Sequence, residues 1–390
     1  MSTWKNGKLL RVRDGQEARV SFVELFFDLI YVFAVTQISH HLLEHLSLWG
    51  AAQALVLWFA VWLGWQYTAW VTNWFDPETL HIRLMLFAIM GVGLVMASAL
   101  PQAFEGRGLS FALCYVAIQV GRSIFVLLSL GGRHPLAPNF RRILGWLCIS
   151  ALFWVAGALQ EGTSRLAFWA MAVACEYFSP MTGFRLPGLG RSSTSDWTIE
   201  GGHLAERCQL FMIVALGESI LVTGATLSHH AHWDAPTLIA FGVAFLGSLA
   251  MWWVYFDTSS KDGSHAIAHS PDPGRMGAYF HYVHVIMVAG VIVTAVANEL
   301  VIAHPDRPID TPSVAVLIAG PLVYLLGNVL YKKAVYGRLP LSQLAGLVAL
   351  AVLTPLAYLT DLLMVGGLTS AILTGVAIWE GCSRRTSRLG

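Results

Sequence analysis

Residues 277–302 read GAYFHYVHVIMVAGVIVTAVANELVI. This stretch contains no lysine or arginine, and its one carboxylate, Glu299, lies near its end. A helix needs about 20 mostly apolar residues to cross the hydrocarbon core of a bilayer, so the stretch is long enough to do so. It therefore predicts a membrane-spanning helix that carries polar side chains, including His281 and His284, inside it.

The composition of the whole chain agrees with this interpretation. Apolar residues make up 56% of the sequence and charged residues 12%, whereas about a quarter of a soluble domain is charged. A soluble protein of this composition would expose large apolar patches, which lipid can solvate instead. The formal net charge is +1, which gives no indication of nucleic-acid binding.

Apolar stretches of similar length recur along the chain. We expect an all-α polytopic membrane protein with about twelve transmembrane helices embedded in the lipid bilayer. Pro355 and Asp361 are the only separators between the last two, so the count over residues 341–379 stays open. The predicted spans are 22–46, 50–72, 82–100, 109–130, 142–159, 164–181, 204–227, 236–256, 277–302, 313–331, 341–357 and 359–379.

The basic residues predict the orientation. Lysine and arginine are enriched in cytoplasmic loops. With twelve spans and a cytoplasmic N-terminus, only Arg107, Arg165 and Arg307 fall outside, whereas the cytoplasmic segments hold most of the others, beginning with Lys5 and Lys8. The sequence therefore predicts that both termini are cytoplasmic. The first twenty residues lack the apolar core of a signal peptide, and none is expected.

Weak similarities between the two halves indicate an internal repeat. Residues 74–76 (Trp-Phe-Asp) and 255–257 (Tyr-Phe-Asp) end the second and eighth spans, and Glu24 and Glu206 begin the first and seventh. We expect two parallel six-helix repeats, residues 1–182 and 203–390, joined by a cytoplasmic linker at 183–202. Transporters built from such repeats bind their substrates at the interface between them.

Ionisable side chains inside the predicted spans are the candidate functional residues. A charge at the centre of a bilayer costs about 2.5–3.5 kcal/mol on insertion scales, so such residues face a protein interior and are often functional. Glu24 and Asp28 are four residues apart and share one helix face. They either pair with a basic side chain on a neighbouring span or form a proton or cation site.

The other candidates lie on three further spans. Arg207 and Glu218 are three helical turns apart on the seventh span, and Glu218 falls near the bilayer centre. Arg122 cannot lose its proton, so it must meet an acid such as Glu218, Glu24 or Asp28, an array of carbonyl groups, or an anionic substrate. The complete candidate set for a proton, cation or substrate site is Glu24, Asp28, Arg122, Glu206, Arg207, Glu218, His281, His284 and Glu299.

Motifs for other chemistry are missing from the sequence. The five cysteines form no CxxC pair, so neither a disulfide framework nor a zinc site is expected. We find no GxSxG, HExxH or phosphate-binding loop. The sequence therefore predicts no cofactor, no metal site and no catalytic residues, and it assigns no enzyme activity.

Three of these stretches resemble the bacterial low temperature requirement protein A family. They are VELFFDL at 23–29, HLAER at 203–207 with ALGES at 215–219, and Tyr282-Val283-His284 with Gly290. The chain departs from the family pattern at Cys208-Gln209. The resemblance implies a multi-pass protein of the inner membrane, named after a phenotype of growth at low temperature and linked to stress response. It implies no substrate or mechanism.

The buried charges and the repeat together favour a secondary transporter of a small molecule, coupled to protons or cations. In this hypothesis Glu218 and Asp28 carry the coupling ion, Arg122 and Arg207 balance charge or bind substrate, and His281 or His284 relays protons. A two-repeat cation channel, or an accessory protein or enzyme without transport, remains an alternative. The substrate is a small molecule or ion, and a homo-oligomer is left open.

Overall fold

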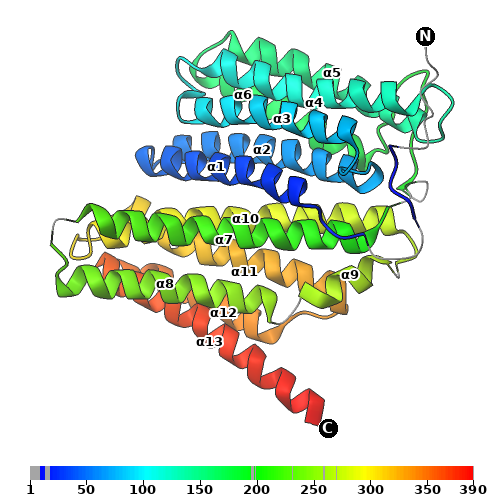
Figure 1. Cartoon of the computed structure of the whole chain (residues 1–390). Coiled ribbons are helices and arrows are strands. Elements are labelled where there is room, and N and C mark those ends of the chain that lie inside the picture. The colour runs from blue at the N-terminus through cyan, green and yellow to red at the C-terminus, as the bar shows by residue number, and fades with distance from the viewer. Residues whose placement is uncertain are drawn as a thin grey trace. The chain divides into compact units, whose positions relative to one another are not determined.

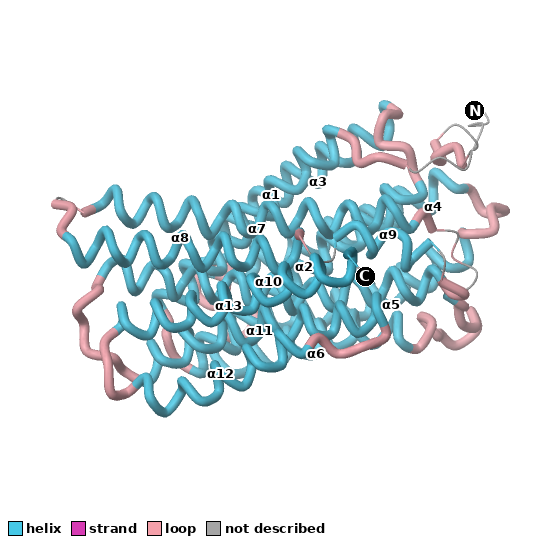
Figure 2. The backbone as a smooth tube through the Cα atoms, turned by 90° about the horizontal axis from the view of Figure 1, so that it is seen from below, coloured by secondary structure: helices cyan, strands magenta, loops and turns pink. Residues whose placement is uncertain are grey.

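The computed structural model describes residues 9–13, 18–194, 197, 199–230, 232–257, 260–268 and 270–389. Lys5 and Lys8, which contributed to the predicted orientation, lie outside these residues. The described residues are almost entirely helical and contain no β-strand (Figure 2). The α-helices are α1 (Phe22–Glu44), α2 (Leu48–Trp74), α3 (Leu80–Ala99), α4 (Gly108–Leu130), α5 (Ala137–Ala158), α6 (Gly162–Met181), α7 (Gly201–His229), α8 (Ala235–Phe256), α9 (Ser260–Ala268), α10 (Pro273–Ala303), α11 (Thr311–Tyr336), α12 (Leu341–Ala357) and α13 (Leu362–Leu389).

The all-helical membrane prediction is confirmed at this level. Within the described residues, ten helices are long and apolar enough to cross a membrane. The exceptions among the predicted spans are α6 and α12. The α12 helix has 17 residues, which corresponds to about 26 Å of helix against a hydrocarbon core of about 30 Å. The count of twelve spans therefore remains a prediction. The short α9 was not predicted.

The chain divides into two compact units, each described separately. The first unit comprises residues 1–41, 49–207 and 267–278, and the second comprises residues 42–48, 208–266 and 279–390. In the first unit α3 packs on α4, α4 on α5, and α5 on α6 (Figure 1). In the second unit α8 packs on α13, and α11 packs on α12 and α13. This division is based on packing, and the predicted sequence repeats remain a prediction.

Aromatic side chains of α2 fill much of the core of the first unit. Trp62 and Trp65 are fully enclosed, and their ring centroids lie 4.8 Å apart. Trp70 and Trp74 continue the row along the helix, with centroids 5.7 Å apart. These tryptophans therefore pack the interior of the first unit.

Small residues let two helices of the second unit approach closely. A Cβ atom at Gly290 of α10 would overlap the backbone of Tyr324 on α11, and one at Gly320 of α11 would lie 2.7 Å from the backbone nitrogen of Thr294. Close backbone approach at glycine is typical of packing between membrane helices, which have no hydrophobic effect to drive their association.

Aspartate caps begin α8 and α11 in the second unit. Asp234 accepts a hydrogen bond from the backbone N–H of Thr237 at the start of α8, at 3.0 Å, and Asp310 accepts one from Ser313 at the start of α11, at 2.9 Å. Each cap satisfies one of the amide donors that a helix leaves unpaired at its first turn.

Candidate functional site

Glu24 anchors a buried cluster in the first unit. Its Oε2 atom accepts hydrogen bonds from Arg11 Nη2 at 3.1 Å and from the backbone N–H and hydroxyl of Ser21, both at 2.9 Å. Its Oε1 atom lies 2.9 Å from His203 Nε2. Both oxygens of this fully enclosed carboxylate are therefore occupied, which indicates a structural anchor.

The N-terminal segment brings Arg11 to this cluster. Arg11 N donates to the carbonyl of Trp74 at 2.9 Å, and Asp76 N donates to the carbonyl of Leu9 at 2.9 Å, so the segment is bound to the end of α2. Arg11 Nε also donates to the carbonyl of Thr72 at 2.7 Å. Sequence reasoning placed Arg11 among the loop charges and missed this role.

Asp28 lies one helical turn after Glu24 and forms a separate ion pair. Its Oδ1 atom accepts from Arg207 Nη2 at 2.7 Å and from Trp65 Nε1 at 2.7 Å. The guanidinium carbon of Arg207 lies 5.6 Å from the ring centroid of Trp65 and 5.9 Å from that of Phe27. Asp28 and Arg207 are both fully enclosed. The expected basic partner of Asp28 is therefore Arg207, from the seventh predicted span.

Several polar atoms of this pair have unused hydrogen-bonding capacity. Asp28 Oδ2, Arg207 Nε and Arg207 Nη1 form no hydrogen bond with a described residue, and neither does the hydroxyl of Tyr31, one turn further along α1. Buried polar atoms are nearly always hydrogen-bonded, and each unmade bond costs about 1–3 kcal/mol. Such atoms mark a place where an ordered water, an ion or a polar ligand can bind.

Arg122 lies beside this site without an acidic partner. Its Nη1 atom donates to Thr68 Oγ1 at 2.9 Å and to the Gly64 carbonyl at 3.3 Å, and its Nη2 atom donates to Gln119. In the described part of the chain it forms no ion pair, so the expected pairing with Glu24 or Asp28 is wrong. Those carboxylates are occupied by Arg11 with His203 and by Arg207. Of the expected alternatives, Arg122 meets a backbone carbonyl.

Gly64 lies next to both Arg122 and Tyr31. A Cβ atom at this position would lie 3.1 Å from the Tyr31 hydroxyl, so the absence of a side chain lets Tyr31 approach the backbone that accepts from Arg122. Tyr31 is also within electrostatic range of both Arg122 and Asp28. Tyr31 therefore lies near both charged groups, and among the described residues its hydroxyl is hydrogen-bonded to neither.

Gln119 joins Arg122 to a further buried acid, Glu176. Its Oε1 atom accepts from Arg122, whereas its Nε2 atom donates to Glu176 Oε2 at 3.1 Å. Glu176 also accepts from Tyr115 at 2.5 Å, from Ser150 at 2.7 Å and from Trp154 at 2.9 Å. This carboxylate has no available oxygen. Arg122 and Glu176 thus compensate one another through an amide, which no spacing in the sequence indicates.

The remaining candidates divide between the two units. Glu206 is half-buried in the first unit and accepts from the backbone N–H of Val20 at 3.1 Å. In the second unit, His284 Nε2 lies 2.6 Å from the Tyr255 hydroxyl and its Nδ1 lies 2.7 Å from the Phe280 carbonyl. Glu218 and His281 are buried in the second unit, and Glu299 is half-buried there.

The second unit contains a buried ion pair that the sequence analysis did not find. Lys332 Nζ lies 2.5 Å from Glu380 Oε2, and Glu380 Oε1 accepts from Ser342 at 2.8 Å. The predicted span 313–331 ended before Lys332, but α11 extends to Tyr336 and buries this lysine. The signal available in the sequence was Gly337, the left-handed residue that ends this helix.

Comparison with known proteins identifies the family. Residues 19–378 match the family profile described as bacterial low temperature requirement A protein (LtrA). The chain belongs to the LtrA family. A protein of Rhizobium meliloti (strain 1021), named "Uncharacterized protein RA0937", is 38% identical to this LtrA protein over 375 residues, which cover 95% of this chain and 91% of the relative. No solved structure matches. Family membership and the apolar helices together make this LtrA protein a multi-pass membrane protein.

Proposed function

We propose that this LtrA protein is a secondary transporter of a small molecule, coupled to protons or cations, and that Asp28, Arg207 and Tyr31 form its coupling site. The observation that carries the proposal is the unused hydrogen-bonding capacity of a fully enclosed ion pair. Asp28 lies six residues into α1, which corresponds to about 9 Å of helix. At that depth a carboxylate either serves as a fixed counter-ion or exchanges its partner.

The contrast with Glu24 distinguishes these two roles. Both oxygens of Glu24 are occupied, as are those of Glu176. Asp28 has one occupied oxygen and one available oxygen, and its arginine retains two nitrogens without acceptors. A buried ion pair is a poor source of stability because desolvation offsets much of the attraction. An incompletely bonded pair is better suited to a site where Oδ2 accepts a proton or cation.

The surrounding residues support an electrostatic role for Arg122. It is held by Thr68, Gly64 and Gln119, and it lies within electrostatic range of Tyr31. Its fixed positive charge would attract a substrate carboxylate or phosphate. We assign Arg122 the role of a fixed charge that binds substrate or balances the coupling ion.

Glu218, His281 and His284 remain candidates for a coupling role of their own. Glu218, His281 and His284 are buried in the second unit, on helices long and apolar enough to cross a membrane. Ionisable residues within membrane-spanning helices are often functional. Glu218→Gln is expected to abolish proton-driven flux and retain exchange. Normal driven transport by Glu218→Gln would remove this residue from the mechanism.

The distribution of lysine and arginine supports the further proposal of twelve spans in two parallel repeats, with both termini on the cytoplasmic side of the inner membrane. Single cysteines at Arg107 and Arg338, placed in a chain from which the five native cysteines have been removed, test it. Labelling of intact spheroplasts by a membrane-impermeant thiol reagent should occur at position 107 and not at position 338.

The main test uses purified protein in proteoliposomes with a pH-sensitive dye and a panel of small molecules. We expect Asp28→Asn to abolish transport driven by a proton or cation gradient while retaining substrate counterflow. Trp65→Phe is the matched control, because it removes the other bond to Oδ1 and leaves the ion pair intact. It should transport at close to the rate of the unmodified protein.

Two results would contradict this assignment. Equal loss of driven transport in Asp28→Asn and Trp65→Phe would indicate that the pair only supports the fold. Unitary currents across a planar bilayer, with a dependence on Asp28, would instead identify the protein as a cation channel.

A further inference from the structure

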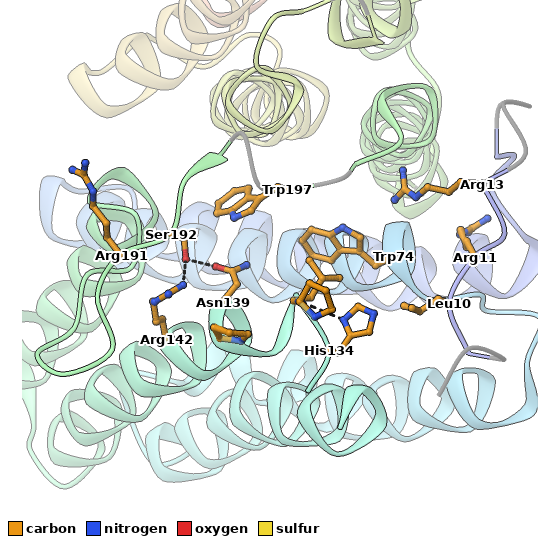
Figure 3. Close-up of a pocket in the computed structure, with 13 residues that line it drawn as sticks. Leu10, Arg11, Arg13, Trp74, His134, Asn139, Arg142, Arg191, Ser192 and Trp197 are labelled. Atoms are coloured by element: carbon orange, nitrogen blue, oxygen red, sulfur yellow. Dashed lines mark hydrogen bonds between the residues drawn. The ribbon is translucent and has the colours of Figure 1, made fainter. Parts of the chain in front are cut away.

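A second site lies in the first unit, away from the Asp28 pair. It is a cavity of about 730 Å³, within the range of about 300–1,000 Å³ that is usual for small-molecule sites. Four parts of the chain form it (Figure 3): the N-terminal segment, the end of α2, the start of α5 and the segment that precedes α7.

The cavity is strongly basic. Its lining includes the arginines at positions 11, 13, 142 and 191 together with His134, and none of the described lining residues carries a carboxylate. Glu200, outside the lining, lies within electrostatic range of Arg13. Arg11 is paired with Glu24 outside the lining, whereas Arg191 is exposed and forms no hydrogen bond or ion pair with a described residue. An excess of positive charge in a lining attracts an anion. The lining therefore favours an anionic occupant.

Successive hydrogen bonds hold three polar side chains of the cavity lining in place. Arg142 Nη1 donates to Ser192 Oγ at 2.8 Å, and Ser192 Oγ donates to Asn139 Oδ1 at 2.5 Å (Figure 3). Arg142 Nε also donates to the carbonyl of Leu189 at 2.7 Å, which holds the linker against α5. The guanidinium and the amide are thus positioned before any ligand arrives.

Two buried N–H donors of this lining have no acceptor among the residues that the structure describes. Asn139 is 6% exposed and Trp197 is 8% exposed. Asn139 Nδ2 and Trp197 Nε1 form no hydrogen bond with a described residue. A buried donor without an acceptor is unfavourable, and an oxyanion is rich in acceptors. The unsatisfied donors and the excess of arginine therefore point to the same chemistry.

We propose that this cavity binds a phosphate-bearing anion, either the headgroup of an anionic phospholipid or a free organic phosphate. Arginine recognises phosphate by paired hydrogen bonds that a point charge cannot supply. The cavity is larger than a phosphate group, and the indoles of Trp74 and Trp197 provide an apolar wall for the rest of the molecule. Arg11 lines this cavity and also pairs with Glu24, so an occupant of the cavity contacts a residue of the Glu24 cluster.

Binding can be measured without a transport assay, so this proposal stands apart from the proposed function. In one arm, glycerol 3-phosphate and inorganic phosphate are titrated into detergent-solubilised protein, and the quenching of tryptophan fluorescence is followed. In the other arm, the protein is placed in nanodiscs of phosphatidylcholine with or without one-fifth phosphatidylglycerol, and retained lipid is identified by native mass spectrometry.

Arg191→Gln and Asn139→Asp are the informative variants. Arg191 has no partner among the described residues that the change would remove. Asn139→Asp retains the acceptor of the Ser192 bond while adding a negative charge to the cavity. We expect affinity to fall by about tenfold for Arg191→Gln, as for the loss of one charge-assisted contact, and further for Asn139→Asp. Arg185→Gln is the matched control, because Arg185 is exposed nearby but does not line the cavity.

Each outcome decides the proposal. Weakened binding of glycerol 3-phosphate in both variants supports a free phosphate, and weakened retention of phosphatidylglycerol supports a lipid headgroup. Binding equal to that of the unmodified protein in both arms, with both variants folded by size-exclusion chromatography, overturns it. An equal effect of Arg185→Gln overturns it as well, because the attraction would then be a diffuse property of the surface charge.

Discussion

Replacement of Arg207 by methionine should strongly destabilise the first unit. Arg207 is fully enclosed, and its Nη2 atom lies 2.7 Å from Asp28 Oδ1. The change would leave Asp28 with a single hydrogen bond from Trp65 and no counter-ion. Removal of one partner from a buried ion pair costs about 3–5 kcal/mol, mainly because the other charge remains desolvated. We therefore expect Arg207→Met to lower the free energy of unfolding by about that amount.

The companion variant removes both charges. In Asp28→Leu with Arg207→Met, no uncompensated charge remains, and replacement of a buried pair by apolar residues is often neutral or stabilising. We expect the double variant to recover most of the stability lost by Arg207→Met. Transport should stay abolished, because the coupling carboxylate is gone. Stability and function should thus separate in one protein.

The measurement is a double-mutant cycle by reversible unfolding in mixed micelles. The chain contains 15 tryptophans, so their fluorescence reports unfolding without a label. Coupling energies between contacting residues usually reach about 0.5–3 kcal/mol. A loss below about 1 kcal/mol in Arg207→Met, or a double variant that loses the sum of the two single losses, would refute the assignment of a tightly coupled pair.

Three further predictions concern the second unit. Gly290→Ala should lower the free energy of unfolding by about 1–3 kcal/mol, because the added Cβ overlaps Tyr324. Gly217→Ala should leave stability unchanged, because an added Cβ there meets nothing within 4 Å, and thermal unfolding compares the two variants. Lys332→Met should cost about 3–5 kcal/mol by isolating the buried Glu380, and Glu380→Gln combined with it should recover much of this loss in the same assay. Hydrogen bonds from Ser313 hold the pKa of Asp310 below its usual range, so the stabilisation from this cap is fully present above the unfolded pKa of about 4 and is lost as the pH falls through the lower folded pKa. Hydrogen exchange at the start of α11 should therefore rise over that pH interval, and Asp310→Asn should show no such rise.

Much of the helical architecture could be predicted because hydropathy acts locally. A bilayer selects apolar stretches of a given length wherever they occur in the chain, so the ten membrane-length helices fall on predicted spans. Residues 341–379 were ambiguous in sequence, and the structure separates them into α12 and α13, with Asp361 capping the second helix through the backbone N–H of Met364 at 2.8 Å.

The partners of the buried charges were harder to predict, because they depend on which helix faces lie together. Glu24 and Asp28 share a face, as expected, yet they take different partners, and Arg122 meets a hydroxyl and a carbonyl where an acid was expected. A backbone carbonyl leaves no signature in a sequence. The roles assigned to Glu218, His281 and Glu299 remain predictions.

The long separation in sequence between Asp28 and Arg207 has a consequence for biosynthesis. The two residues are 179 positions apart, which corresponds to roughly 9–36 s of translation at 5–20 residues per second. During that interval the first helix has emerged from the ribosome, whereas its counter-charge has not yet been made. The nascent α1 must therefore be kept hydrated, protonated or shielded by the insertion machinery until α7 arrives.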